Sequence, residues 1–459
     1  PAWYNTTGDV AVCRTEAEAI AQFTAAGQST TGIRQDDDVV DTWFSSWLWP
    51  ISVFDGFRDP DNADITYYYP TNDLVTAPEI LFFWVARMIM AGLEYRDEVP
   101  FKNVYLTGIV RDKQGRKMSK SLGNSPDPIE LMAQYGADGV RTGMLFSSPA
   151  GNDLPFDESL CEQGRNFSNK IWNAFRLVKG WEVQDLAQPA ENAVAVAWMR
   201  SRSNGALADL ADQYDQFRIS EALMTTYKLT WDDLCNWYLE SIKPAFGAPI
   251  DRATYEATLG LFEDVLKLLH PFMPFLTEEV WHHVRERKDG EDLIISPWPE
   301  GGAQDEKLET EVQHAFDLVT ALRNLRNERG LSPKEALKVQ VRGALPMRES
   351  VAGLVRKLAN AEAITGQDVL GEGLVTFLVD TTEYGVDLGG SIDPEAERKK
   401  AEEELDYLRG FLKSVDKKLA NERFVSGAPP QVVENERKKK ADAESKIAAL
   451  EARIGQLAG

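Results

Sequence analysis

Hydrophobic residues near the end of the chain follow the spacing of a coiled coil. Two runs of apolar residues, each three and four positions apart, are separated by a break that contains Gly427, Pro429 and Pro430. The first run is Leu405, Leu408, Leu412, Val415 and Leu419, and the second is Ile447, Leu450, Ile454 and Leu457. Two heptad helices joined by such a break predict an antiparallel coiled coil over residues 391–459.

A different helical pattern fills the middle of the chain. Apolar residues recur at i, i+4, i+7 and i+11 from Phe167 to Val178, and at i, i+4 and i+8 from Leu234 to Ile242. This spacing places them on one face of each helix. Pro271 and Pro274 separate two further helices, so residues 166–300 are predicted to form a helical bundle.

Residues 1–165 mix short strand-like runs with helical runs. Residues Asn103–Val110 predict a buried strand, and a charged loop follows it. Asp127 and Pro128 then supply an N-cap and a first-turn proline for a helix that Gly136 ends. Strand, loop and helix in this order are typical of α/β folds.

Residues 301–390 carry the weakest pattern of the chain. They predict a helix around His314–Arg329 and short strands at Leu337–Val341 and Val375–Val379. We expect a small mixed α/β junction in this region.

Composition narrows the class of protein. The 459 residues are 43% hydrophobic and 27% charged, which is usual for a globular protein of several domains. The longest apolar stretch, Ile80–Met90, is short and contains Arg87, so neither a transmembrane helix nor a membrane partner is expected. The chain shows no signal peptide. It opens with Pro1 and has no initiator methionine, which favours a piece of a longer protein.

Cysteine and histidine usage excludes several chemistries. Cys13, Cys161 and Cys235 are too far apart for a disulfide framework or a metal motif, which favours a reducing, cytoplasmic location. The four histidines all lie at or beyond His270, so a histidine-based metal site or triad in the first half is excluded. We expect His270 to pack at a helix end, and no metal site in the chain.

The net charge of −23 argues at first against a nucleic-acid partner. However, residues 391–459 hold 14 basic and 14 acidic residues, so the whole acidic excess lies in residues 1–390. A polyanion can therefore still be bound by local basic surfaces.

One basic loop directly follows the predicted strand. Residues 111–120 contain five cations and one acid, with Gly115 and Gly123 to give the loop freedom. Cations on a mobile loop at a strand end are suited to holding phosphates, above all a leaving pyrophosphate. On composition alone, a solvated basic turn is the favoured interpretation.

The order of residues within this loop carries a resemblance. Lys117–Ser121 reads KMSKS, the signature of class I aminoacyl-tRNA synthetases. Three flanking segments resemble the valyl-tRNA synthetase family and occur in that family's order: residues 41–50 (DTWFSSWLWP), 80–88 (ILFFWVARM) and 231–238 (WDDLCNWY). The resemblance covers essentially the whole chain.

The resemblance implies an ATP site and an amino-acid pocket. Lys120 is expected to contact ATP with Lys117 assisting, and these two lysines are the catalytic candidates. The expected ATP-binding set is Glu79, Lys117, Met118, Ser119, Lys120 and Ser121. Trp43 and Trp84 are expected to wall the valine pocket. Glu79 would approach the ATP ribose, although residues 77–79 (APE) replace the family's usual Gly-aromatic-Asp.

The resemblance also implies an architecture. It is multidomain α/β plus all-α: the C-terminal part of a Rossmann-type catalytic domain (1–165), a helical anticodon-binding domain (166–300), a small junction (301–390) and an antiparallel coiled-coil arm (391–459). The family's other signature, HIGH, and its editing domain are missing. The chain therefore resembles the C-terminal half of a valine–tRNA ligase, and the isolated chain is expected to be inactive.

Partners follow from the same resemblance. Valine, ATP with Mg²⁺ as its counter-ion, and tRNA(Val) are expected, with a monomeric parent enzyme. The arm's basic residues are the tRNA-backbone candidates, against a solvated coiled-coil exterior as the competing interpretation. They are Lys413, Lys417, Lys418, Arg423, Arg437, Lys438, Lys439 and Lys440.

Two other functions remain open at this point. One is a noncatalytic tRNA-binding module, because the HIGH signature is missing. The other is a sibling class I synthetase, such as the isoleucyl enzyme. Residues 80–84 and Asp41–Trp43 favour valine among the siblings.

Overall fold

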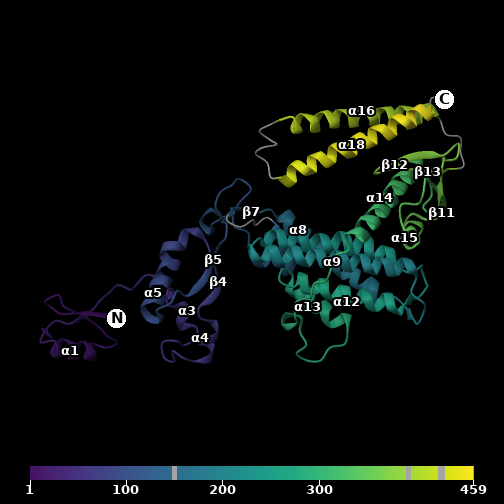
Figure 1. Cartoon of the computed structure of the whole chain (residues 1–459). Helices are drawn as coiled ribbons and strands as arrows, with labels where there is room; N and C mark the ends of the chain where they lie inside the picture. The colour runs from purple at the N-terminus through teal and green to yellow at the C-terminus, as the bar shows by residue number, and fades with distance from the viewer. Residues whose placement is uncertain (147–151, 389–393, 422–429, 458–459) are drawn as a thin grey trace. The chain divides into compact units, whose positions relative to one another are not determined.

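The computed structural model describes residues 1–146, 152–388, 394–421 and 430–457. It divides into two compact units (Figure 1): unit 1 is Pro1–Ser125 with Ser148–Phe156, and unit 2 is Pro126–Ser147 with Asp157–Gly459. Unit 1 contains the α/β part of the chain. Unit 2 contains the helical bundle, the junction and the two arm helices.

Unit 1 begins with a small antiparallel sheet in the strand order β2-β1-β3, covered by one helix. Its elements are β1 (Ala2–Tyr4), β2 (Val10–Val12), α1 (Glu16–Ala25) and β3 (Arg34–Gln35). Thr15 caps α1 by accepting a hydrogen bond from the Glu18 amide. Ala11, Ala19 and Phe23 form the core of this sheet and helix.

The centre of unit 1 is a β-α-β unit with parallel strands. β4 (Thr71–Thr76) pairs with β5 (Phe101–Leu106), and α5 (Ala86–Arg96) connects them. Leu74, Val85, Met88 and Phe101 form the core between these elements. A crossover helix between parallel strands is the building block of Rossmann-type folds.

Shorter elements complete unit 1. Before β4 lie α2 (Thr42–Ser46), α3 (Trp49–Ser52) and α4 (Ala63–Tyr68). Between β4 and α5 lie a 3₁₀ turn, η1 (Pro78–Ile80), and a π-helical turn, η2 (Leu81–Val85). After β5 come β6 (Val110–Arg111), η3 (Lys120–Leu122) and β7 (Leu154–Pro155), of which β6 and β7 pair in parallel.

The prediction of one buried strand over Asn103–Val110 is wrong in two respects. The strand ends at Leu106, and Val104 on it is 37% exposed. At Gly108 the backbone passes so close to Asn152 that an added Cβ would lie 1.5 Å from the Asn152 carbonyl oxygen. A separate strand, β6, then pairs with β7 instead of continuing the pairing of β5 with β4.

Unit 2 starts with three helices: α6 (Pro128–Tyr135), α7 (Ala137–Phe146) and α8 (Glu158–Lys179). The predicted cap of α6 is confirmed, since Asp127 accepts a hydrogen bond from the Ile129 amide and Gly136 follows the last residue. α7 lies directly on α8: a Cβ on Gly164 would meet the Gly139 carbonyl oxygen at 2.3 Å. These glycines allow the two backbones to touch.

The contacts therefore group α6 and α7 with the bundle, although the sequence assigned them to residues 1–165. The predicted domain limits at residues 166, 301 and 391 stay predictions. Short paired strands, β8 (Val183–Gln184) and β9 (Ile250–Asp251), lie between the helices of the bundle.

The bundle continues through long helices packed on one shared core. They are α9 (Ala190–Asp215), α10 (Ile219–Lys228), the π-helical η4 (Leu229–Tyr238), α11 (Leu239–Ile242), α12 (Arg252–Leu269) and α13 (Pro274–Val284). The predicted face Leu234, Tyr238 and Ile242 is fully buried. The break between α12 and α13 falls at the two predicted prolines.

The junction follows η5 (Leu293–Ile295) and is a four-stranded sheet with two helices. Its elements are α14 (Glu306–Arg329), β10 (Leu337–Arg342), α15 (Glu349–Ala359), β11 (Ala361–Gln367), β12 (Val375–Val379) and β13 (Thr382–Asp387). The strand order is β11-β10-β13-β12. The predicted helix and both predicted strands are confirmed.

The arm consists of α16 (Pro394–Leu419) and α18 (Pro430–Leu457), which lie side by side in Figure 1. Salt bridges join Arg409 to Glu451 at 2.7 Å and Asp416 to Lys440 at 2.8 Å. Because residue numbers rise along one helix as they fall along the other, the pair is antiparallel, as predicted. Leu405 and Leu450 are buried in the seam.

Candidate functional site

The KMSKS segment (Lys117–Ser121) lies in the loop that leaves β6. Asp112 and Gly115 form a tight turn in which the Gly115 amide donates to the Asp112 carbonyl at 2.8 Å, with φ of +76° at Gly115. Lys117 then returns to form an antiparallel bridge with Arg111. The segment is therefore anchored at the end of a strand rather than free on a long loop.

Asp112 is the centre of this loop. Its carboxylate is only 8% exposed and accepts hydrogen bonds from the amides of Gln114 (3.0 Å) and Arg116 (2.9 Å). It also accepts from the Arg116 guanidinium at 2.8 Å and from Asn124 Nδ2 at 2.9 Å. The Asn124 hydrogen bond, together with those from Arg116 and Gln114, holds the pKa of Asp112 well below its usual range despite desolvation.

Asn124 connects Asp112 to the signature itself. Its Oδ1 accepts from the Ser119 amide at 2.9 Å, and its Nδ2 reaches the Lys117 carbonyl at 3.3 Å. Sequence reasoning missed both residues. An Asp three positions before a Gly is a turn signal that could have identified Asp112, whereas no local pattern identifies Asn124.

The structure brings two of the predicted ATP-binding residues together. Lys117 Nζ lies 3.3 Å from Glu79 Oε1, although the residues are 38 positions apart. Both side chains are exposed, so this ion pair contributes at most about 1 kcal/mol and is easily exchanged for a ligand.

The rest of the segment is held by its backbone. Met118 donates its amide to the Val110 carbonyl at 3.2 Å, and the hydroxyls of Ser119 and Ser121 lie 3.1 Å apart. Lys120 begins η3, but its side chain lies outside the described residues.

Trp43 and Trp84 lie in neighbouring elements. Trp84, in η2, donates its indole N–H to the Ser46 carbonyl at the end of α2 (3.2 Å) and stacks on Trp49. Trp43, in α2, stacks on Phe83 at 6.3 Å between ring centroids. Arg87 of α5 forms a salt bridge of 3.2 Å with Asp41, the N-cap residue of α2.

Neither tryptophan lines a nearby cavity of about 260 Å³. That cavity is lined mainly by apolar residues, which include Trp49, Phe54, Met88 and Phe101. A valine pocket walled by Trp43 and Trp84 therefore stays a prediction, with both side chains partly exposed.

The arm's basic residues fall into two groups. Four of them pair with acids of the arm: Lys418 and Lys439 with Glu436, Arg437 with Glu434, and Lys440 with Asp416. Among the described residues, Lys413, Lys417 and Lys438 are exposed and have no ion pair or hydrogen bond. Arg423 lies outside the described residues.

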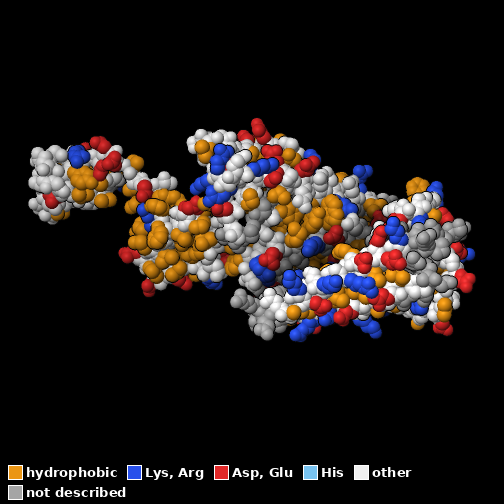
Figure 2. All heavy atoms as spheres, turned by 90° about the horizontal axis from the view of Figure 1, so that it is seen from above, with side chains coloured by type: hydrophobic (Ala, Val, Ile, Leu, Met, Phe, Trp, Pro, Cys, Tyr) orange, Lys and Arg blue, Asp and Glu red, His pale blue; other side chains and the backbone are white. Residues whose placement is uncertain are grey.

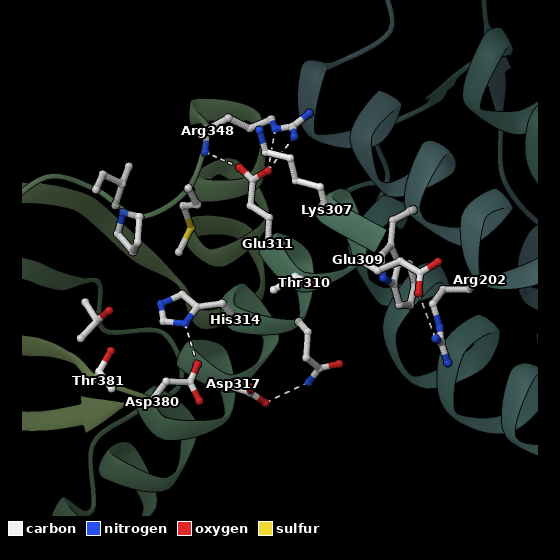
Figure 3. Close-up of a pocket in the computed structure, with 16 residues that line it drawn as sticks. Arg202, Lys307, Glu309, Thr310, Glu311, His314, Asp317, Arg348, Asp380 and Thr381 are labelled. Atoms are coloured by element: carbon white, nitrogen blue, oxygen red, sulfur yellow. Dashed lines mark hydrogen bonds and ion pairs between the residues drawn. The ribbon is translucent and has the colours of Figure 1, made fainter. Parts of the chain in front are cut away.

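A larger cavity, of about 1130 Å³, lies where the bundle meets the junction (Figure 3). Three ion pairs lie at this cavity: Arg348 with Glu311 at 2.6 Å, Arg202 with Glu309 at 3.1 Å, and His314 with Asp380 at 3.0 Å. These pairs join α9, α14 and the loops of the junction sheet. We assign the three pairs a structural role, since each of them links neighbouring elements of this unit.

Two more features concern the predictions about a metal site and about the membrane. In the part of the chain that the structure describes, Glu278, His282 and Asp292 form a group able to hold a metal ion, although the sequence led us to expect no metal site. No described helix combines the length and the apolar character that crossing a membrane requires.

Three family models match the chain along its length. Residues 5–157 match the class I tRNA synthetases for isoleucine, leucine, methionine and valine, and residues 197–341 match the anticodon-binding domain of tRNA ligases. Residues 393–458 match the tRNA-binding arm of valyl-tRNA synthetase. The chain is a class I aminoacyl-tRNA synthetase sequence, with the α/β and all-α parts that the predicted fold class requires.

Curated relatives narrow the class. The valine–tRNA ligases of Parabacteroides distasonis and Phocaeicola vulgatus are each 53% identical over the whole chain, and that of Chlorobaculum tepidum is 37% identical over 99% of it. The chain belongs to the valyl-tRNA synthetase family. It spans about half the length of these relatives, 53% in each case.

The similarity of this chain to solved structures is weaker than its similarity to these relatives. A ternary complex of Agrobacterium radiobacter K84 LeuRS with tRNA and LeuAMS aligns with a TM-score of 0.48 at 16% identity, over 76% of this chain and 43% of that one. Methionyl-tRNA synthetase of Mycobacterium tuberculosis aligns with a TM-score of 0.42 at 19% identity, over 63% of each chain. Similarity at this level does not bear on function.

Proposed function

We propose that this chain is part of a valine–tRNA ligase that activates valine with ATP and transfers it to tRNA(Val). In the first step a carboxylate oxygen of valine attacks the α-phosphorus of ATP, and pyrophosphate leaves. In the second step the terminal ribose hydroxyl of the tRNA takes the valyl group and AMP leaves. Identity to valine–tRNA ligases over the whole chain supports this proposal.

One observation carries the proposal. The chain folds so that Lys117 of the KMSKS segment meets Glu79, the residue that the resemblance sets beside the ATP ribose. An exposed Lys–Glu pair suits a nucleotide site, because arriving phosphates can take the lysine and the ribose hydroxyls can take the carboxylate. Pairing of two residues from separate elements is not expected of an ordinary solvated turn.

Lys117 and Lys120 act on the phosphates in this proposal. Negative charge grows on the leaving pyrophosphate, so a lysine that approaches it stabilises the transition state more than the bound ATP. The Asp112–Asn124 network fixes the loop backbone from which both lysines extend. Ser119 and Ser121 offer hydroxyl donors and Met118 holds the segment against β6.

Mg²⁺ would accompany ATP as its counter-ion. The only carboxylate within residues 111–124 is Asp112, and four donors already occupy it. The loop therefore fits the phosphates rather than the metal ion. Any protein ligand to Mg²⁺ would have to come from elsewhere in the parent protein.

The apolar surface of unit 1 supports a larger parent protein. Figure 2 shows hydrophobic side chains gathered over the part that carries α3 and α5. Trp49 on α3 is 54% exposed and Met90 on α5 is 61% exposed. A contiguous apolar surface of this kind is normally covered. We propose that the half of the relatives' length that this chain does not span covers it.

The arm is proposed to bind the tRNA backbone. Within the described part of the arm, its exposed lysines without acidic partners, Lys413, Lys417 and Lys438, are the strongest candidates. The match to the valyl-tRNA synthetase arm supports this role. A cytoplasmic location and a monomeric parent enzyme stay predictions.

The test is valine-dependent exchange of pyrophosphate into ATP by the full-length parent protein. We expect a higher kcat/KM for valine than for isoleucine, and a decrease of about 10²-fold in kcat for Lys120→Ala with little change in the valine KM. Lys102→Ala, an exposed lysine on β5, is the matched control. Preference for isoleucine would favour the sibling synthetase.

The isolated 459-residue chain is the second sample to test. It lacks the part of the ATP site that the HIGH signature would supply, so we expect no pyrophosphate exchange above background. Unchanged turnover of full-length Lys120→Ala, together with tRNA binding by this chain, would favour the noncatalytic tRNA-binding module instead.

A further inference from the structure

The loop between α13 and η5 returns to α13 at two side chains that are one helical turn apart. Glu278 and His282 are i and i+4 on α13, so their side chains lie next to each other. His282 Nε2 lies 3.3 Å from Glu278 Oε1 and 3.2 Å from Asp292 Oδ1. The three ligand atoms all lie within 4.8 Å of one another.

The two separations from His282 match a metal coordination sphere. A tetrahedral ion with bonds of about 2.0–2.1 Å places neighbouring ligand atoms roughly 3.3–3.4 Å apart. Imidazole nitrogens and carboxylate oxygens are both ligands that Zn²⁺ takes in proteins. The two carboxylates carry negative charge that a divalent cation neutralises.

Backbone amides hold Glu278 in place, and a tryptophan fixes the loop next to Asp292. The amides of Leu293 (2.7 Å) and Ile294 (3.2 Å) each donate to one oxygen of Glu278. Trp281 fixes the loop by donating its indole N–H to the Glu291 carbonyl at 2.9 Å, next to Asp292 in sequence. Support of this kind orients ligands in metal sites.

Asp292 is the N-cap residue of the short 3₁₀ turn η5 and has the ordinary extended backbone of that position. Its side chain makes no cap hydrogen bond and lies instead toward His282.

We infer that Glu278, His282 and Asp292 bind a divalent transition-metal ion of the Zn²⁺ class. Water completes its coordination, because the ligand side chains are 29–47% exposed. The ion fastens the loop before η5 to α13 and so stiffens one end of the bundle. This site is independent of the KMSKS segment and of the proposed function.

The chain itself contains a matched control. Glu279 and His283 form the same i, i+4 pair one position further along α13, at 3.0 Å and with greater exposure. No third described carboxylate joins that pair in a metal-binding group. Comparing the removal of His282 with the removal of His283 therefore distinguishes a metal site from an ordinary Glu–His pair.

The experiment is calorimetric titration of the whole chain with ZnCl₂ in buffer free of chelators. We expect one saturable site, at least tenfold weaker in His282→Asn and in Asp292→Asn, and unchanged in His283→Asn. Co²⁺ is the second probe, and its visible absorption should show imidazole and oxygen ligation that His282→Asn removes. Circular dichroism verifies that each variant is folded.

Three results would overturn the inference. They are absence of saturable Zn²⁺ binding by the unchanged chain, equal binding by His282→Asn, and equal weakening by His282→Asn and His283→Asn. Any of them would mean that His282 contacts the two carboxylates without a metal ion. If His282→Asn fails to fold, the Zn²⁺ affinities of Asp292→Asn and His283→Asn are compared instead. Only Asp292→Asn should bind more weakly.

Discussion

Asn124 Nδ2 donates a hydrogen bond of 2.9 Å to Asp112 Oδ2, and this hydrogen bond ties the KMSKS segment to the end of β6. The same side-chain amide accepts from the Ser119 backbone. The lysines of the segment therefore extend from a backbone that two residues outside the signature, Asp112 and Asn124, hold in shape.

The first prediction follows from that hydrogen bond. In the full-length parent protein, Asn124→Ala should lower kcat for valine-dependent pyrophosphate exchange by about tenfold, because a loosened loop positions the lysines less often. The valine KM should change little. Gln114→Ala is the control, since the Gln114 side chain makes only a 3.4 Å hydrogen bond with Arg116. Equal kinetics for Asn124→Ala and Gln114→Ala would contradict a positioning role.

The second prediction concerns pH. The pKa of Asp112 is lowered in the folded chain, mainly by the Asn124 hydrogen bond, so its stabilisation is present above the unfolded pKa of about 3.9. It is lost as the pH falls through the lower folded value. The difference in thermal midpoint between the unchanged chain and Asp112→Asn should be constant from pH 7 to about pH 5 and shrink below that. A difference that does not vary with pH would argue against the network.

The third prediction separates the arm's two kinds of lysine. Lys417→Ala with Lys438→Ala should weaken tRNA binding and flatten its log–log salt dependence by roughly 0.7 to 0.9 for each phosphate that is no longer neutralised. Lys439→Ala should have a smaller effect, because Glu436 at 2.8 Å already neutralises that lysine. Filter binding at several salt concentrations measures both. Identical slopes for all variants would indicate a merely solvated exterior.

The fourth prediction tests how the bundle and the junction are joined. Phe316 of α14 is buried, stacks on Trp237 at 4.1 Å and meets the edge of Trp198 at 5.1 Å. Phe316→Ala should cost about 3–5 kcal/mol because it leaves a cavity between three helical elements. Scanning calorimetry should show a lower midpoint. Phe275→Ala, at a residue 66% exposed, should leave the midpoint nearly unchanged.

Local patterns predicted much of the fold. The heptads of the arm, the cap at Asp127 and the prolines between α12 and α13 each act within a few residues, so they can be recognised without the rest of the chain. The strand over Asn103–Val110 was misjudged because its end depends on Asn152, more than forty residues away. The π-helical geometry of η4 also has no local signal in the pattern.

For the site, the sequence by itself determined which residues are candidates for function. They are the KMSKS segment, the two tryptophans and the cations of the arm. Tertiary structure alone decided which of these residues meet. It paired Lys117 with Glu79, made Asn124 the support of the loop, and neutralised Lys439 and Lys440 within the arm. It also brought Asp292 back to His282, which no local spacing shows. The physical reason is range: capping and periodicity act between near neighbours in sequence, whereas hydrogen bonds and ion pairs need only proximity in space.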